Sequence, residues 1–118
     1  MAKILIADDA AFMRMRCSTI LKELGHEVVE AEDGAQAVDA YKADTFDAVL
    51  LDITMPVMDG MEALKVIMEH DPDAKVAMVT AMGQQKVIME AIKIGAKDFV
   101  VKPFDSDRIQ AALWKLVG

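Results

Sequence analysis

Short apolar runs alternate along the chain with stretches in which apolar residues recur every three or four positions. The runs have the length of strands buried on both faces, and the recurring positions are typical of helices with one apolar face. The pattern predicts five strands, at residues 3–7, 27–31, 47–51, 75–79 and 98–101. A helix is expected after each strand, and the inner faces of these helices are expected to carry Met13, Cys17, Ile20, Leu21 and Leu24; Ala37, Val38 and Tyr41; Met61, Leu64, Ile67 and Met68; Val87, Ile88, Ala91 and Ile92; and Ile109, Ala112, Leu113 and Leu116.

This unbroken alternation of strand and helix determines the expected fold class. Parallel strands need helical crossovers between them, and such crossovers are nearly always right-handed. We therefore expect an α/β fold, a doubly wound, flavodoxin-like (βα)5 arrangement around a five-stranded parallel sheet. The strand order 2-1-3-4-5 is assumed because it is one of the two common orders of doubly wound sheets. Residues 1–118 are expected to form one domain, the usual number for a chain of this length.

The charge balance narrows the function classes. Thirteen Lys and Arg residues against twenty Asp and Glu residues give a net charge of −7, which repels phosphate backbones and argues against nucleic-acid binding. The single cysteine, Cys17, cannot form a disulfide within the chain. No apolar stretch has the length of a signal peptide or of a membrane span, so we expect a cytoplasmic protein without membrane contact.

Polar side chains end four of the five predicted strands. Asp8 and Asp9 follow the first strand, Asp52 the third, Thr80 the fourth and Lys102 the fifth. Because the carboxyl ends of parallel strands meet at one edge of the sheet, where doubly wound folds bind ligands, these side chains are expected to converge. Taken singly, each could instead be a helix cap or a surface charge.

Three converging carboxylates need either a proton or a cation to relieve their repulsion. A few hard oxygen ligands with room for water suit Mg²⁺, and no cysteine or histidine is expected nearby to favour zinc. With the Lys102 ammonium and the Thr80 hydroxyl opposite, the set could hold a phosphoryl group while Asp52 attacks the phosphorus atom in line.

These residues resemble the receiver domains of two-component response regulators, and the resemblance covers the whole chain. Asp8 and Asp9 look like the acidic pair of the family, Asp52 like its phosphorylated aspartate, and Lys102 like its lysine, which Pro103 follows. The resemblance implies that Asp9, Asp52 and the main-chain carbonyl of Thr54 ligate Mg²⁺ directly and that Asp8 acts through water. It also implies a cis Lys102–Pro103 peptide, which is plausible because only X–Pro bonds adopt cis at low cost.

Four segments look most like stand-alone chemotaxis regulators of the CheY type: DDAAFMRMR (8–16), DITMPVMDG (52–60), TAMGQQ (80–85) and GAKDFVVKPF (95–104). In this family Thr80 would be the switch hydroxyl, and Phe99 would follow it inward after phosphorylation. Phe99 stands where the family often has tyrosine. Thr54 and Met82 occupy the variable positions that follow Asp52 and Thr80 by two residues, so the lifetime of the phosphoryl group is left open.

By the same resemblance, the protein is a signal carrier and not a turnover enzyme. A sensor histidine kinase would donate the phosphoryl group, a flagellar motor switch protein would bind the phosphorylated form, and a phosphatase is a further possible partner. We expect a monomer. The candidate contact residues, on the face made by the fourth and fifth helices and the fifth strand, are Met82, Val87, Met89, Phe99 and Trp114.

Three other interpretations remain open from the sequence. The chain could be a receiver domain excised from a larger DNA-binding regulator. It could be an aspartyl phosphatase of the haloacid-dehalogenase type, although that type needs a second acid where Thr54 stands. It could also be a flavodoxin-like cofactor carrier, although Asp8 and Asp9 would repel phosphate at the position of its binding loop.

Overall fold

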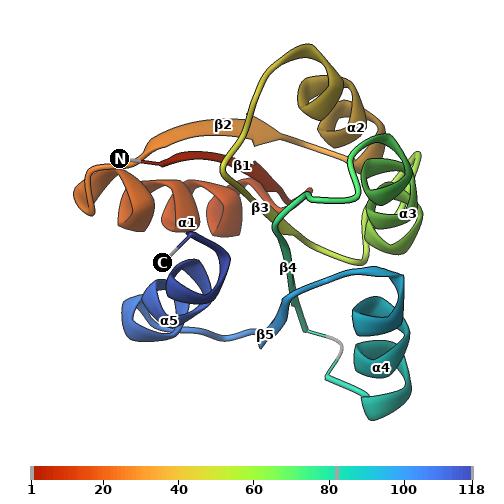
Figure 1. Ribbon diagram of the computed structural model, residues 1–118. Helices are drawn as coiled ribbons and strands as arrows, with labels where there is room; N and C mark the ends of the chain where they lie inside the picture. Colours follow the sequence, from red (N-terminus) through yellow and green to blue (C-terminus); the bar gives the residue numbers. More distant parts are fainter. Residues whose placement is uncertain (1, 82, 118) are drawn as a thin grey trace.

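The computed structural model describes residues 2–81 and 83–117 (Figure 1). In chain order the elements are β1 (Lys3–Ala7), α1 (Ala11–Glu23), β2 (Glu27–Ala31), α2 (Gly34–Ala43), β3 (Ala48–Leu51), α3 (Gly60–His70), β4 (Val76–Thr80), α4 (Gln85–Ile94), β5 (Asp98–Val101) and α5 (Ser106–Val117). The five strands form one parallel sheet in the order β2-β1-β3-β4-β5, which confirms the predicted fold class and strand order.

The register between β1 and β3 determines where the candidate site lies. Ala7 pairs with Leu51 across these two strands, so the residues that follow, Asp8 and Asp52, leave the sheet side by side. The N–H of Asp52 donates to the carbonyl of Ala7 at 2.9 Å and extends the ladder to the aspartate itself. The two acids are therefore positioned by regular strand geometry.

Helices cover both faces of the sheet, and each face has its own core. In Figure 1, α1 and α5 lie side by side on one face, and α2, α3 and α4 cover the other. Along β1, Leu5 and Ala7 point into one core while Ile4 and Ile6 point into the other. Strands buried in this way account for the apolar runs, and each fully buried Leu or Ile contributes about 1.5–3 kcal/mol. Within the described residues, no helix is both long and apolar enough to cross a bilayer.

The predicted helix faces were wrong at three positions. Ile88 is only partly buried and lies with Ile92 on the exposed apolar face of α4. Ile92 is 47% exposed, and the inward line of α4 runs through Ala91 to Ile94, which packs against the core. Leu24 is 38% exposed because α1 ends one residue earlier, at Glu23.

The bounds of two strands also differ from the prediction by one residue. β3 begins at Ala48 because the side chain of Asp47 accepts a hydrogen bond from the Lys3 N–H at 2.8 Å. β4 extends to Thr80, which is therefore the last residue of the strand and not the first of the loop.

Two glycines pin the loop that follows Asp52. A Cβ at Gly60 would lie 1.8 Å from the carbonyl oxygen of Asp52, and one at Gly34 would lie 2.1 Å from that of Met58. The Gly34 N–H donates to the Met58 carbonyl at 3.0 Å, and the Gly60 N–H donates to the Ile53 carbonyl at 2.7 Å. Only residues without a Cβ allow this approach, so residues 53–59 are held tightly beside the candidate site.

The same loop contains a strained residue. Val57 has a φ of 67°, and the N–H of Met58 donates to the carbonyl of Pro56 at 2.7 Å, which closes a γ-turn around Val57. A β-branched residue is unfavourable in this conformation. The Val57 side chain is 84% exposed, so packing offsets little of the strain.

We predict that Val57→Gly stabilises the fold. Relief of about 1–3 kcal/mol of backbone strain should outweigh the added entropy of the unfolded chain, about 0.4–1 kcal/mol, for a net gain of about 1 kcal/mol. Urea denaturation of the two proteins measures the difference. Val57→Ile, which keeps the branched Cβ, is the control and should leave the free energy of unfolding unchanged; a glycine variant no more stable than the wild type would contradict the strain.

Candidate functional site

Three carboxylates meet at the carboxyl edge of the sheet. Asp8 and Asp9 come from the end of β1 and Asp52 from the end of β3, and one oxygen of each lies within 4.8 Å of the others. Asp8 and Asp52 are each only 6% exposed, whereas Asp9 is exposed. The structure thus brings together the acids that the sequence placed at neighbouring strand ends, with one of them open to solvent.

Lys102 reaches this cluster from the end of β5. Its Nζ lies 2.7 Å from Oδ2 of Asp8 and 3.1 Å from Oδ2 of Asp52. Its N–H donates to the carbonyl of Thr80 at 2.8 Å, which ties the ends of β4 and β5 together. The Lys102–Pro103 peptide is cis, as predicted. One ammonium therefore serves two buried carboxylates.

The pKa values of the two partners respond differently to this sharing. Burial raises the pKa of Asp52, and the negative charge of Asp8 adds to the rise. The attraction and hydrogen bond of Lys102 and the hydrogen bond from the Ile53 N–H only partly oppose it. Burial alone would lower the pKa of Lys102, but hydrogen bonds and attraction from Asp8 and Asp52 outweigh it and raise that pKa. The lysine therefore stays charged, but it balances only part of the negative charge of the three carboxylates.

Hydrogen bonds from backbone N–H groups orient the other oxygens of Asp8 and Asp52. Oδ1 of Asp8 accepts from the Ala10 N–H at 2.9 Å, and Oδ1 of Asp52 accepts from the Ile53 N–H at 2.7 Å. Arg14 donates to the carbonyl of Asp8 at 2.7 Å and pairs with Glu30 of β2. Three carboxylates against one ammonium leave an excess of negative charge on oxygen ligands, a donor set that fits a hard divalent cation such as Mg²⁺.

Cys17 lies closer to the site than expected. It lines a small hollow with Asp8 and Phe104, although the sequence led us to expect no cysteine nearby. Burial, followed by the charge of Asp8, raises the pKa of the thiol to about 12. The thiol is therefore protonated at neutral pH, and metal binding needs a thiolate, so its presence does not change the preference for oxygen ligands.

Residues 4–114 match the response regulator receiver domain family. This chain belongs to that family. The receiver domain is 56% identical over 117 residues to chemotaxis protein CheY of Bacillus subtilis and 57% identical over 116 residues to CheY of Listeria monocytogenes, with 98% of each chain covered in both comparisons. A crystal structure of a CheX–CheY–BeF3–Mg²⁺ complex from Borrelia burgdorferi superimposes with a TM-score of 0.92 at 38% identity, covering 94% of this chain and 85% of that one.

The predicted switch residues of this receiver lie where β4 and β5 run side by side. Thr80 ends β4 and is 1% exposed. Phe99 is half-buried and packs against the core under α4. The hydroxyl and the ring therefore lie on neighbouring strands, between the acidic cluster and α4.

A second charged cluster, which was not predicted from the sequence, lies at the start of β5. Arg108 of α5 donates to both oxygens of Asp98 at 3.1 and 3.2 Å and to the carbonyl of Phe99 at 3.1 Å. Burial alone would raise the pKa of Asp98, but Arg108, the Phe99 N–H and Lys115 outweigh it and lower that pKa. The available signal was an acid at the start of an apolar strand followed ten residues later by arginine.

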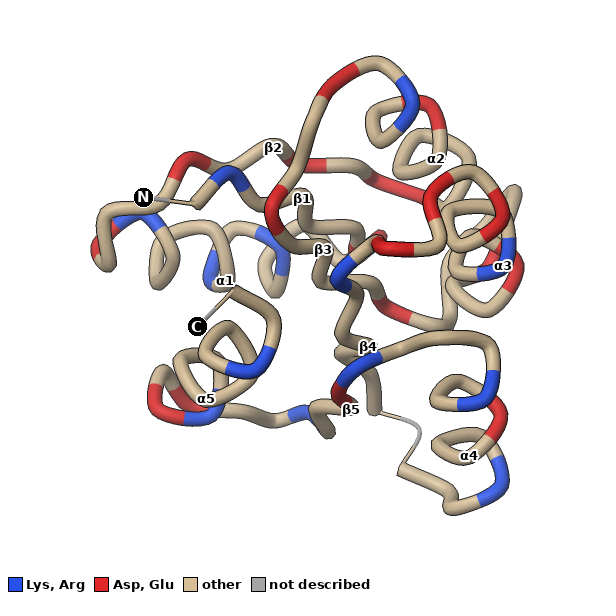
Figure 2. Tube along the Cα trace, viewed as in Figure 1, with Lys and Arg blue, Asp and Glu red and all other residues tan. Residues whose placement is uncertain are grey.

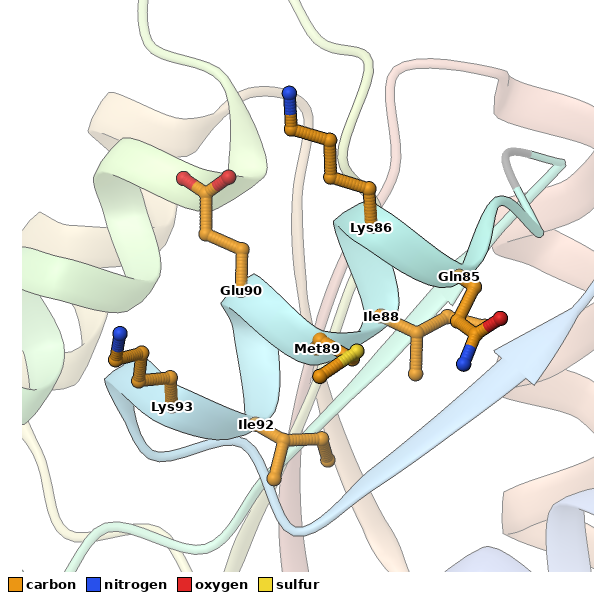
Figure 3. Close-up of a pocket in the computed structure, with 7 residues that line it drawn as sticks. All are labelled: Gln85, Lys86, Ile88, Met89, Glu90, Ile92 and Lys93. Atoms are coloured by element: carbon orange, nitrogen blue, oxygen red, sulfur yellow. The ribbon is translucent and has the colours of Figure 1, made fainter.

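The predicted contact residues do not share one surface. Met89 is 62% exposed and lies with Ile88 and Ile92 on an apolar face of α4 (Figure 3). Trp114 is 75% exposed but lines a groove beside the end of α1, away from α4. Three further candidates differ: Val87 and Phe99 are half-buried against the core, and Met82 lies outside the described residues.

We predict that Asp52→Asn is more stable than the wild type at neutral pH in a chelating buffer. Because burial raises the pKa of Asp52 in the folded state, its contribution to stability is present only below the pKa of an unfolded aspartate and is lost as pH rises through the folded value. The difference should shrink as pH falls to about 4.

Thermal melts across this pH range, with and without Mg²⁺, measure the effect. Mg²⁺ should stabilise the wild type more than Asp52→Asn, since a ligand stabilises the form that binds it better. Asp39→Asn, an exposed position on α2, is the control. A wild type that is the more stable protein without metal would show that the Lys102 pairing outweighs burial.

Proposed function

We propose that this receiver domain is a phosphorylation-controlled switch in a chemotaxis two-component system, with Asp52 as the phosphoryl acceptor. The observation that carries the proposal is the burial of Asp52 between two further acids and the Lys102 ammonium at the carboxyl edge of the sheet. The relatives called chemotaxis protein CheY, which match nearly the whole chain, support the chemotaxis assignment.

Phosphoryl transfer needs little covalent chemistry from the protein. A carboxylate oxygen of Asp52 attacks phosphorus, the P–N bond to a phosphohistidine of the sensor kinase breaks, and its electron pair returns to the imidazole, which takes up a proton. Lys102, already 3.1 Å from Asp52, neutralises a phosphoryl oxygen as charge shifts. Mg²⁺ would be held by Asp9, Asp52 and the Thr54 carbonyl, with Asp8 acting through water, and when bound it supplies positive charge to the phosphoryl oxygens.

The switched state ends by hydrolysis. Water attacks phosphorus, the bond to the Asp52 oxygen breaks, and inorganic phosphate leaves. The protein assists both steps on its own side chain and regenerates once for each signal, so it is a signal carrier and not a turnover enzyme. The Borrelia neighbour was crystallised with CheX, which supports a phosphatase as a further partner.

Output is carried by a shift between two conformations. Thr80 would move toward the phosphoryl oxygens and Phe99 would follow it inward, which remodels the surface made by α4 and β5. Driving such a domain from mostly inactive to mostly active takes about 5 kcal/mol of differential interaction. The exposed apolar face of α4 around Met89 is the surface that we assign to the flagellar motor switch protein.

We predict that incubation with acetyl phosphate and Mg²⁺ adds one phosphoryl group to the wild type and none to Asp52→Asn. Intact mass spectrometry measures the addition, and borohydride trapping of the acyl phosphate locates it. Asp39→Asn should be labelled as well as the wild type, and chelation of Mg²⁺ should abolish labelling. Equal labelling of Asp52→Asn would rule out the proposal.

We predict that Met89→Gln weakens binding of the beryllofluoride-treated protein to its motor switch partner by about tenfold, because central apolar side chains dominate such interfaces. Isothermal titration calorimetry measures the affinity. Met15→Gln is the matched control, since Met15 is a similarly exposed methionine, 57%, on α1. Equal losses in the two variants would remove the assignment of the α4 face, while phosphorylation of Asp52 would stand.

A further inference from the structure

A second apolar surface lies between the ends of α1 and α5. A groove of about 430 Å³ is lined there by Leu24, His26, Gln110, Leu113, Trp114 and Val117. Three of these are exposed hydrophobic side chains: Leu24 at 38%, Val117 at 42% and Trp114 at 75%. Scattered exposed hydrophobic residues are ordinary, but three around one hollow form a patch of the kind that marks an interaction site.

Trp114 is the largest exposed apolar side chain that lines this groove. It is the one tryptophan of the chain, and most of its ring faces solvent. Tryptophan is among the residues most enriched at the energetic centres of protein interfaces, because its large rigid ring loses little entropy on binding. Leu113, the preceding residue of α5, also lines the groove and is 4% exposed, so a buried side chain adjoins the exposed ring.

The charges around the groove indicate the chemistry of its occupant. Asp47 lines an adjoining hollow that shares His26 and Val117 with the groove. Glu23 and Glu27 lie on either side of the turn from α1 into β2, where Figure 2 shows acidic positions. Lys3 is shared by Asp44 and Glu27, so these three groups together still carry one excess negative charge. Lys22, at the end of α1, stands against Glu23 and Asp47.

We propose that this groove binds a positively charged, amphipathic helix of another protein. The apolar face of the helix would cover Trp114 and Val117, and its Lys or Arg residues would face Asp47 and Glu27. The lining residues of α5 span two helical turns, about 10 Å, which accommodates anchors at positions i and i+3 or i+4 of the bound helix. A second copy of this chain fits less well, because two chains of charge −7 repel each other.

The groove lies at the opposite end of the sheet from the acidic site. His26, which lines the groove, and Ala2, which lines the adjoining hollow, come just before β2 and β1, whereas Asp8 and Asp52 follow β1 and β3. Five residues of strand separate the two ends by about 17 Å. The charges that change on phosphorylation are therefore distant from the groove, and we expect a partner bound there to be held in both signalling states.

The test uses Trp114 as its own reporter. Designed helices of about 18 residues, long enough to be helical in water, carry a leucine face with either a lysine or a glutamate polar face. The lysine helix should bind, shift the tryptophan emission to shorter wavelength, and bind more weakly as salt is added. The glutamate helix should do neither.

Matched variants locate the binding, measured by anisotropy of the labelled lysine helix. Trp114→Ala, at an exposed position that the fold does not need, should weaken binding by at least about tenfold. Asp47→Asn combined with Glu27→Gln should weaken it severalfold. Met89→Gln on α4, and beryllofluoride treatment, should leave it unchanged.

Three results would overturn the proposal. One is equal binding of the lysine and glutamate helices. Another is binding of the lysine helix that does not shift the emission of Trp114, or that is as tight to Trp114→Ala as to the wild type. The third is an emission shift that depends on protein concentration alone and accompanies a doubled mass in sedimentation, which assigns the groove to a second copy. None of these outcomes bears on phosphorylation of Asp52, so the proposed function is tested separately.

Discussion

One ammonium shared by two buried carboxylates is the interaction on which the structure depends. Lys102 lies within hydrogen-bonding distance of Asp8 and Asp52, and a third acid, Asp9, stands at the rim. Burial makes the charge on Asp52 unfavourable, and a single lysine cannot compensate for both neighbours. The folded protein therefore tolerates this edge of the sheet at some cost in stability, and it gains from a cation that balances the excess negative charge. A site that is costly when empty is suited to a switch.

Regular packing elements hold that arrangement in place. The pairing of Ala7 with Leu51 brings the two strand ends together, and the N–H of Lys102 bonds to the carbonyl of Thr80 at the end of β4. Behind Asp52, Gly60 allows the loop to cross its carbonyl oxygen at a distance that no other residue would permit. The strain at Val57 falls in this same loop, which is consistent with strained backbone gathering at functional sites where the surroundings enforce it.

The fold and the acidic cluster were predictable from sequence because both follow from short-range patterns. Apolar runs of strand length ending in Asp8, Asp52 and Lys102 specify a buried parallel sheet and the edge at which those residues meet. The orientation of side chains on the surface helices was not predictable in the same way. Ile92 has a spacing that fits the inner face of α4, but the packing of Ile94 turns it outward. Likewise, nothing local to residue 114 reveals that its neighbours are Leu24 and His26, nearly ninety positions earlier.

The two ends of the sheet are coupled to the chemistry to different degrees. At β5, Arg108 of α5 bonds to Asp98 and to the carbonyl of Phe99, and Lys102 directly follows the strand. A displacement of Lys102 toward a phosphoryl group therefore acts on a strand that α5 also holds. The α4 face lies directly beyond this strand and can respond. Four of the six residues that line the groove at Trp114 also come from α5, but from the part of the helix beyond Arg108, and the other two, Leu24 and His26, lie at the opposite end of the sheet from Asp52. One surface is thus placed to read the state of the site, and the other to bind regardless of it.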